Sequence, residues 1–148
     1  MEIQRRAKRE DVESIVRLLI DDQLGAGRDS TDDLGPYLKA FEDIDADASQ
    51  HLMVADLGAE VVGTLQLTII PGLARKGALR GQVEAVRVRS DQRGGGLGGT
   101  LMDWAIEESR RRGCALVQLT SDQSRVDAHR FYLRLGFAAS HQGFKLTF

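Results

Sequence analysis

Hydrophobic residues along this chain follow two spacings, and each change of spacing marks the border of a predicted element. The helical interval of three to four residues appears first at Val12, Ile15, Val16 and Leu19. It predicts a helix from 11 to about 22. The same interval predicts further helices within 31–43, from about 96 to 112 and from about 126 to 135.

Strand-like segments lie between these helices. They are expected at 3–6, 51–57, 60–70, 82–88 and 116–120, with two more strands within 137–148. The second and third of them predict an antiparallel hairpin around Gly58. A hairpin followed by strand, helix, strand and helix implies an α/β fold with a mixed sheet and helices on its faces.

A glycine-rich segment joins the strand at 82–88 to the next helix. It reads Gln92-Arg93-Gly94-Gly95-Gly96-Leu97-Gly98-Gly99. Glycine lets the backbone approach a ligand closely, and the first amides of a helix are free donors at the positive end of the helix dipole. The segment therefore predicts a cradle for a phosphate or pyrophosphate.

Three kinds of phosphate site compete for this segment. A nucleotide-hydrolase loop would need Gly-Lys-Ser/Thr, but no lysine lies between Lys76 and Lys145. A dinucleotide fingerprint fits Gly94, Gly96 and Gly99 only weakly, because five residues separate the strand from the first glycine and too little chain follows for a doubly wound sheet. The pattern R-x-x-G-x-G fits better.

The segment 92–98 resembles the acetyl-CoA pyrophosphate loop of the Gcn5-related N-acetyltransferases (GNAT). A second signature, Ala128-His129-Arg130-Phe131-Tyr132-Leu133-Arg134-Leu135-Gly136-Phe137, is similar to the family's A-x-x-F-Y-x-x-x-G-F segment. The two motifs occur in the family's order and at its spacing. The resemblance is sharpest from 82 to 137.

This resemblance implies a single N-acetyltransferase domain over 1–148, with the family's mostly antiparallel central sheet flanked by helices. It implies acetyl-CoA as co-substrate and direct transfer to a primary amine in a ternary complex, the acceptor being a small amine. The acceptor site is expected at the first two helices, their 25–30 connection and the 71–81 loop. Family habit makes a homodimer an expectation.

Two residues are the expected catalysts. A primary amine has a pKa of roughly 10.4, so supplying its neutral form at pH 7 costs about 4.6 kcal/mol. Glu84 resembles the acid that takes this proton, and Tyr132 matches the family tyrosine that protonates the leaving thiolate. In a regular strand Glu84 shares a face with Val86 and Val88, which would shield it from water. Alternatively, Glu84 is a carboxylate that faces solvent and Tyr132 is an aromatic residue of the core.

The expected cofactor-binding residues lie at the end of the strand, on the glycine segment and before the last helix. The backbones of Val86 and Val88 would pair with the pantetheine arm like an added strand. Arg125 stands where many family members have Asn; it would meet a cofactor phosphate or remain exposed. The full set is Val86, Arg87, Val88, Arg93, Gly94, Gly95, Gly96, Leu97, Gly98, Gly99 and Arg125.

Charge is unevenly distributed along the chain. Residues 75–112 carry nine bases and five acids, which suits an anionic cofactor. Residues 21–47 carry nine acids and two bases; they would attract a cationic amine or simply form a solvated surface. The overall net charge of −2 argues against nucleic-acid binding.

Composition narrows the remaining possibilities. With 148 residues and 42% hydrophobic residues, the chain can bury its own core. It shows no apolar run of membrane-spanning length and no signal-peptide core, so a cytoplasmic location is expected, with no membrane partner. Cys114 is the single cysteine, and His51 and His141 show no metal-ligand spacing, so no metal is expected.

Two alternatives to a small-molecule enzyme remain open at this stage. The chain could be an acyl-CoA-binding sensor that has the cradle without turnover. It could also acetylate a lysine side chain or an N-terminus of a protein. The presence of both Glu84 and Tyr132 favours an enzyme over a sensor.

Overall fold

A five-stranded sheet organises most of the chain. The computed structural model describes residues 2–22 and 24–148, which form two compact units, Met1–Gln118 and Leu119–Phe148. The strands of the first unit lie side by side in sequence order: β1 (Glu2–Arg6), β2 (Gln50–Leu57), β3 (Glu60–Ile70), β4 (Leu79–Val88) and β5 (Cys114–Gln118). Neighbouring strands are antiparallel except β4 and β5, which confirms the predicted mixed sheet.

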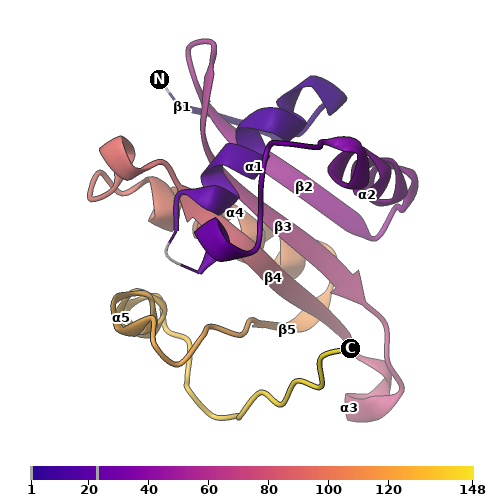
Figure 1. Cartoon of the computed structure of the whole chain (residues 1–148). Coiled ribbons are helices and arrows are strands. Elements are labelled where there is room, and N and C mark those ends of the chain that lie inside the picture. Colours follow the sequence, from indigo (N-terminus) through magenta and orange to yellow (C-terminus); the bar gives the residue numbers. More distant parts are fainter. Residues whose placement is uncertain (1, 23) are drawn as a thin grey trace. The chain divides into compact units, whose positions relative to one another are not determined.

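Helices cover both faces of this sheet. Helices α1 (Val12–Ile20) and α2 (Gly35–Ala46) lie on one face, and α4 (Leu97–Arg111) lies on the other (Figure 1). The buried residues of the core on the α1 side are Ala7, Val12, Ile15, Val16, Phe41 and Val54. Those of α4 include Leu97, Leu101, Met102 and Ala105. Three of the four residues that predicted α1, Val12, Ile15 and Val16, are therefore among those that bury in this core.

An ion pair fixes the start of α1 to the sheet edge. The Arg5 guanidinium donates two hydrogen bonds to the Asp11 carboxylate, at 2.7 and 2.9 Å, and a third to Asp56 on β2 at 3.1 Å. Asp11 also accepts from the Lys8 amide at 2.7 Å. Because Arg5 stabilises the ionised form, the pKa of Asp11 is held below its usual value. The bidentate geometry fixes direction as well as distance.

Short turns separate these elements, and some element boundaries differ from those predicted from the sequence. Three 3-10 turns appear at Arg9–Asp11, Gly25–Gly27 and Ser90–Gln92. The expected loop at 71–81 contains the turn α3 (Ala74–Gly77), and β4 begins already at Leu79. Arg75, Lys76 and Gly77 all have positive φ, so α3 is a left-handed turn.

The second unit contains one helix, α5 (Val126–Arg134), followed by an extended segment. The prediction of two strands within 137–148 is wrong for this structure: the described chain has no strand there, and Figure 1 draws the segment as a plain trace. A strand exists only where a neighbouring backbone accepts and donates its hydrogen bonds. Alternating side chains alone therefore do not make 137–148 a strand.

Helix α4 packs tightly against β4 at Gly81. A Cβ built on Gly81 would collide with the hydroxyl of Ser109 and lie 3.1 Å from its Cβ. Ser109 is buried and donates to the Ala105 carbonyl at 2.7 Å, so its side chain is not free to turn away. The contact requires glycine at this position of β4.

Gly81→Ala should destabilise the protein by roughly 1–3 kcal/mol, as expected for overpacking in a core. The double variant Gly81→Ala/Ser109→Ala should lose less than the sum of the two single changes, because the colliding hydroxyl is gone. Denaturant unfolding measures both. Gly27→Ala, whose Cβ would meet no atom within 4 Å, is the matched control and should be nearly neutral. Strict additivity would contradict the proposed contact.

Candidate active site

A bulge in β4 sets the geometry of the candidate site. Glu84 is paired with Gln66 of β3, whereas Arg87 is paired with Thr64, so two residues of β4 oppose the single Leu65. Ala85 in this bulge has φ +53°, an uncommon conformation for a residue other than glycine. Bulges of this kind bend a strand and change the direction of its side chains.

The bulge reverses the side-chain alternation expected for β4. Glu84 and Arg87 lie on the face that carries Gln66 and Thr64, while Val88 pairs with Gly63, whose Cα faces Leu97 and Leu101 of α4. Glu84 therefore does not share a face with Val88, and it is exposed rather than shielded. The burial inferred from regular alternation is wrong, because one inserted residue moves every later side chain to the opposite face.

Glu84 belongs to a row of polar side chains that crosses from β5 to β4. Gln118 donates to the Gln82 side-chain oxygen at 3.0 Å, and the Gln82 amide nitrogen donates to Glu84 at 2.8 Å. The row fixes the orientation of Gln82 and leaves the second carboxylate oxygen of Glu84 without a recorded partner. Sequence reasoning missed both glutamines, although Gln82 at two residues before Glu84 is the neighbour that a strand places on the same face.

After Gln82, β4 is no longer paired with β5. The parallel pairing of the two strands covers only Leu79–Gln82 on β4, so from Val83 to Val88 the described structure shows no β5 partner. The Arg89 amide donates to the Val62 carbonyl of β3 at 2.8 Å. Alternate residues of a strand direct their backbone groups to opposite edges, so those of Val86 and Val88 point to the open edge. Their carbonyls accept from the guanidiniums of Arg87 and Arg93, at 2.9 and 3.0 Å.

The glycine segment forms an open turn before α4. Gly94 and Gly96 have φ of +85° and +88°, so the turn requires glycine at these two positions. A Cβ at Gly94, Gly96 or Gly99 would meet no protein atom within 4 Å. In the described residues the first amide with a helical partner is that of Thr100, which leaves the amides of 94–99 without a recorded acceptor. An anionic group fits this cradle of free donors.

Arg93 holds the cradle to the end of α1. Its guanidinium donates to the Asp21 carbonyl at 2.8 Å and lies 3.6 Å from the Asp21 carboxylate. The same carboxylate accepts from the Ser90 amide at 3.1 Å. Arg93 is thus committed to protein groups in this structure, although its side chain remains 52% exposed. Asp21 is a site residue that no sequence motif marked, because its partners lie about 70 residues away.

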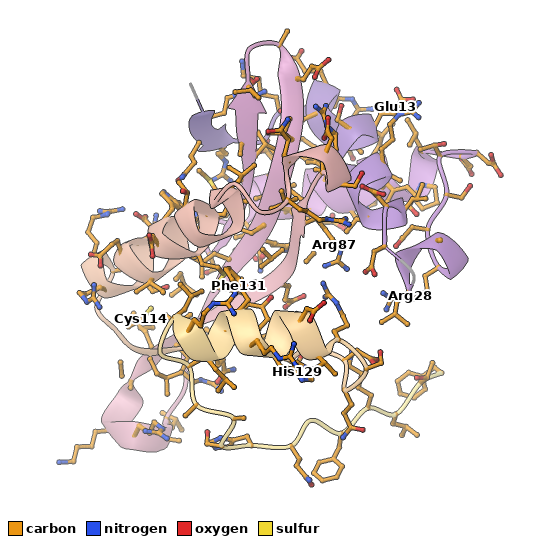
Figure 2. The ribbon with its side chains drawn as sticks, turned by 90° about the vertical axis from the view of Figure 1, so that its left-hand side faces the viewer. Glu13, Arg28, Arg87, Cys114, His129 and Phe131 are labelled. Atoms are coloured by element: carbon orange, nitrogen blue, oxygen red, sulfur yellow. The ribbon has the colours of Figure 1, made fainter. Side chains whose placement is uncertain are left out.

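Arg87 makes a second connection to α1. Its guanidinium lies 3.2 Å from the Asp22 carboxylate, and the two side chains are only 13% and 15% exposed. Figure 2 shows Arg87 projecting from β4. An ion pair this far removed from water ties the strand to the segment just after α1 rather than presenting a free cation to a ligand.

An apolar cavity lies beside Glu84, between the sheet and the first two helices. Its volume is about 120 Å³, enough for about four water molecules. It is lined by residues of α1, α2, β2 and β3 and by Ala85 of the bulge; Gln66, the cross-strand neighbour of Glu84, is also part of the wall. The first two helices thus border a partly open apolar pocket close to Glu84. Gln66 itself donates to Gln50 at 2.8 Å.

Two of the predicted site residues lie on the second unit, which is described by itself. Tyr132 packs against Phe131 and Phe137, with ring centroids 5.2 and 6.0 Å apart. Arg125 is half-buried at the N-cap of α5, and its carbonyl accepts from the His129 amide at 3.1 Å. In Figure 2, Phe131 and His129 project from opposite sides of α5.

Other chemistries find no support among the described residues. In the described ranges 2–22 and 24–148, no group of three or more His, Cys, Asp or Glu is placed to hold a metal. The Nε2 of His129 donates to the Asp122 carbonyl at 2.8 Å, an interaction between α5 and the segment just before it. His51 is buried on β2, and burial lowers its pKa. Within the same ranges, the helices all fall short of the length and apolar content that a membrane span needs.

Comparisons with known proteins identify the relatives of this chain. The sequence pattern of the Acetyltransferase (GNAT) family matches residues 12–137. An aminoalkylphosphonate N-acetyltransferase from Salmonella typhimurium is 37% identical over 95 residues, and a glucosamine 6-phosphate N-acetyltransferase from Trypanosoma brucei brucei is 37% identical over 86 residues. These matches cover 64% and 58% of this chain, and 61% and 56% of the relatives, so the chain spans about three fifths of their length.

A solved structure resembles the whole chain. It is described as a transcriptional regulator from Bacillus halodurans C-125, is 44% identical, and superposes with a TM-score of 0.97 over 100% of both chains. The fold is therefore one that an experimental structure already represents over this full length.

The bulge should be sensitive to side-chain branching. Ala85→Val should destabilise the protein by about 1–3 kcal/mol, because a β-branched residue does not tolerate φ +53°. Ala85→Gly should be close to neutral. The control Ala78→Val places the same change at an extended backbone with φ −70° and ψ 140°, and should cost little. Thermal and denaturant unfolding measure the three; equal losses at 85 and 78 would argue against a strained bulge.

Proposed function

The chain belongs to the acetyltransferase (GNAT) family, and we propose that it transfers an acetyl group from acetyl-CoA to a primary amine by direct attack in a ternary complex. The observation that carries the proposal is the continuity of one surface of the first unit. The glycine cradle follows the end of β4, and the open edge of β4 leads back from it to the bulge. Glu84 and the apolar cavity lie at this bulge. Cofactor and acceptor would then meet at the bulge.

The cradle suits the pyrophosphate of acetyl-CoA. Free amides at 94–99 supply several donors to phosphate oxygens, and glycine leaves the approach unobstructed. The pantetheine arm contains amide groups, which match the backbone groups of Val86 and Val88 at the open edge. For this pairing the Val86 and Val88 carbonyls would give up their hydrogen bonds from Arg87 and Arg93 and accept from amides of the arm instead. Arg87 and Arg93 would position the site, while Arg125 would meet a phosphate.

Glu84 is the proposed base. Acetyl-CoA supplies a thioester carbonyl, and the amine must lose a proton to attack it. The Glu84 oxygen that Gln82 does not occupy can accept that proton, directly or through a water molecule. Tyr132 is the proposed acid, which would return a proton to the departing thiolate. On α5 its ring packs against Phe131 and Phe137.

The acceptor is proposed to be a small amine that also carries a phosphonate or phosphate group. The two curated relatives are named for an aminoalkylphosphonate and for glucosamine 6-phosphate, which share an amine and a phosphorus oxyanion. A cavity of about 120 Å³ accommodates a short aliphatic chain better than a sugar ring. The amine end would then lie near Glu84, with the anionic end outside the cavity.

Arg28 is the proposed contact for the anionic end. It is exposed on the connection between α1 and α2, the region expected to form the acceptor site, and Figure 2 shows it projecting away from that connection. Its Nε donates to the Leu24 carbonyl at 3.1 Å, which orients the guanidinium and leaves its outer nitrogens for a ligand.

Acetyl-CoA should bind, and an amine should release its thiol. Calorimetric titration with acetyl-CoA, with NAD and ATP as controls, tests the cradle. A thiol-release assay with aminoalkylphosphonates, glucosamine 6-phosphate, uncharged alkylamines and lysine-containing peptides then tests the transfer. Binding of NAD instead would return the glycine segment to a dinucleotide site. Acetyl-CoA binding without release from any amine would favour a sensor, a role in keeping with the name of the Bacillus halodurans relative.

Glu84→Gln should lower kcat by about 10²–10⁴-fold and leave the Kd of acetyl-CoA nearly unchanged, because the amide fills the same space but accepts no proton. Tyr132→Phe should also lower kcat. Glu13→Gln, an exposed carboxylate of α1 paired with Arg17, is the control and should keep full activity. Full activity in Glu84→Gln would reassign the base.

Arg28→Ala should raise KM roughly tenfold or more for an aminoalkylphosphonate and leave KM for an uncharged alkylamine unchanged, because a charge-assisted contact is lost. Steady-state kinetics with the two acceptors gives the comparison. Arg17→Ala, another exposed arginine of the same half of the chain, is the matched control. An equal effect on both acceptors would remove Arg28 from phosphonate recognition.

A further inference from the structure

A row of polar side chains crosses the sheet of the first unit on the face opposite α4. Its members, paired in register across β2, β3, β4 and β5, are Gln50, Thr68, Gln82 and Gln118. Gly81 of β4 faces Ser109 of α4, so Arg80 and Gln82 on either side of it point to the opposite face. The row therefore lies on the same face as Glu84, two residues further along β4.

The amides of this row keep hydrogen-bonding capacity for a ligand. Gln82 donates to Glu84 at 2.8 Å, and its oxygen accepts from Gln118 at 3.0 Å. On the other side of the row, the Gln50 oxygen accepts from the Thr68 hydroxyl at 2.9 Å. Among the described residues, the Gln118 oxygen and the Gln50 amide nitrogen have no recorded partner. A surface that offers both donors and acceptors without a charge suits hydroxyl groups, which also donate and accept.

Arg80 places a cation at the far end of the same face. It lies two residues before Gln82, as Gln82 lies two before Glu84, and its side chain is half-buried. Its Nη2 lies 3.8 Å from the position that a Cβ would take at Gly72. Within the described ranges, Arg80 has no recorded ion pair or hydrogen bond, and 61–83 contains no acidic residue. A half-buried guanidinium without a partner is costly, and a phosphate would supply a bidentate one.

We propose that this face of β4, from Glu84 through Gln82 to Arg80, is a second acceptor track, which takes a hydroxylated primary amine with a phosphate several bonds from its nitrogen. The amine would lie at Glu84, the hydroxyl groups along Gln82 and Gln118, and the phosphate at Arg80. The inference rests on the proposed acetyl transfer and uses the same base. The nitrogen loses a proton to Glu84 and bonds to the thioester carbon, and the carbon–sulfur bond breaks. Overall, an ammonium and a thioester become an amide, a thiol and one proton.

The two approaches to Glu84 differ in polarity and in length. Toward α1 and α2 lies the apolar cavity of about 120 Å³, which suits a short aliphatic chain. Along β4, four residues separate Arg80 from Glu84, a backbone distance of about 13 Å, and the wall between them consists of amides. The track therefore favours an acceptor that is longer and more polar than the one expected in the cavity. An amino sugar phosphate has this distribution of groups.

Steady-state kinetics with two acceptors that differ only in a phosphate tests Arg80. Arg80→Met should raise KM for glucosamine 6-phosphate roughly 10–100-fold, because a charge-assisted contact is lost, and should change kcat and the KM for glucosamine by less than about threefold. Arg80→Lys keeps the charge without the planar fork and should give an intermediate KM. Arg75→Met, which removes an exposed cation of the same connection, is the control and should change KM by less than about threefold. Equal losses for both sugars, or in the control, would overturn the contact.

Gln118→Leu tests the polar row at a residue that does not touch Glu84. KM for both sugars should rise about 3–10-fold, because they share their hydroxyl groups, while KM for an uncharged alkylamine should not change. Arg28→Ala should leave KM for glucosamine 6-phosphate unchanged, since the phosphate lies at Arg80. An equal rise of KM for the alkylamine would show that Gln118 does not contact the acceptor and would overturn this part of the track.

Binding without turnover separates the track from the proposed reaction. CoA carries no acetyl group, so calorimetric titration of glucosamine 6-phosphate into the protein with CoA measures affinity alone. Binding that Arg80→Met weakens at least about tenfold supports the track, and with no thiol release from any amine it would remove the reaction and keep the site. Transfer to a short aminoalkylphosphonate without binding of glucosamine 6-phosphate would overturn the track and keep the reaction. Binding that is insensitive to Arg80→Met would also overturn the track.

Discussion

The one extra residue in β4 is the constraint on which the site depends. Without the bulge at Ala85, Glu84 and Val88 would face the same way and Arg87 would point toward α4. With it, Glu84 and Arg87 both face α1 and α2, and Arg87 reaches Asp22. The bulge also occurs just after Gln82, where β4 loses its pairing with β5. One local irregularity therefore gives the strand an exposed carboxylate, an open edge and a bend within a few residues.

The end of α1 holds the other side of this arrangement. Asp21 accepts hydrogen bonds from the Ser90 amide and the Arg93 guanidinium, which flank the start of the cradle. Asp22 forms an ion pair with Arg87 of β4. Two consecutive carboxylates thus fix both the proposed cofactor cradle and the strand that leads to it. Their positions are in turn set by α1, whose first turn is fixed by the Arg5–Asp11 pair. Contacts at both ends of α1 thus connect the sheet edge at β1 with the segment that leads into the cradle.

Sequence reasoning identified the elements and motifs well, because they depend on local spacing. The period of Val12, Ile15 and Val16 predicted α1, and the glycine segment predicted the turn before α4. It missed what depends on pairing across the chain. The exposure of Glu84 follows from the register shift between β3 and β4, and no residue type in β4 predicts that shift. The contacts of Asp21 join residues about 70 positions apart, and the acidic stretch that contains it has the composition of an ordinary solvated surface.

The C-terminal segment shows the same division between pattern and partner. Alternation at Phe144, Leu146 and Phe148 is a property of the sequence and indicates a chain suited to a sheet. Whether such a segment becomes a strand depends on a neighbouring backbone that exchanges hydrogen bonds with it, and no residue type within the segment carries that information. Residues 137–148 form no strand in this structure. Alternation was sufficient where a strand lies in a hairpin close in sequence, as in β2 and β3, and insufficient where a partner must come from a distant part of the chain.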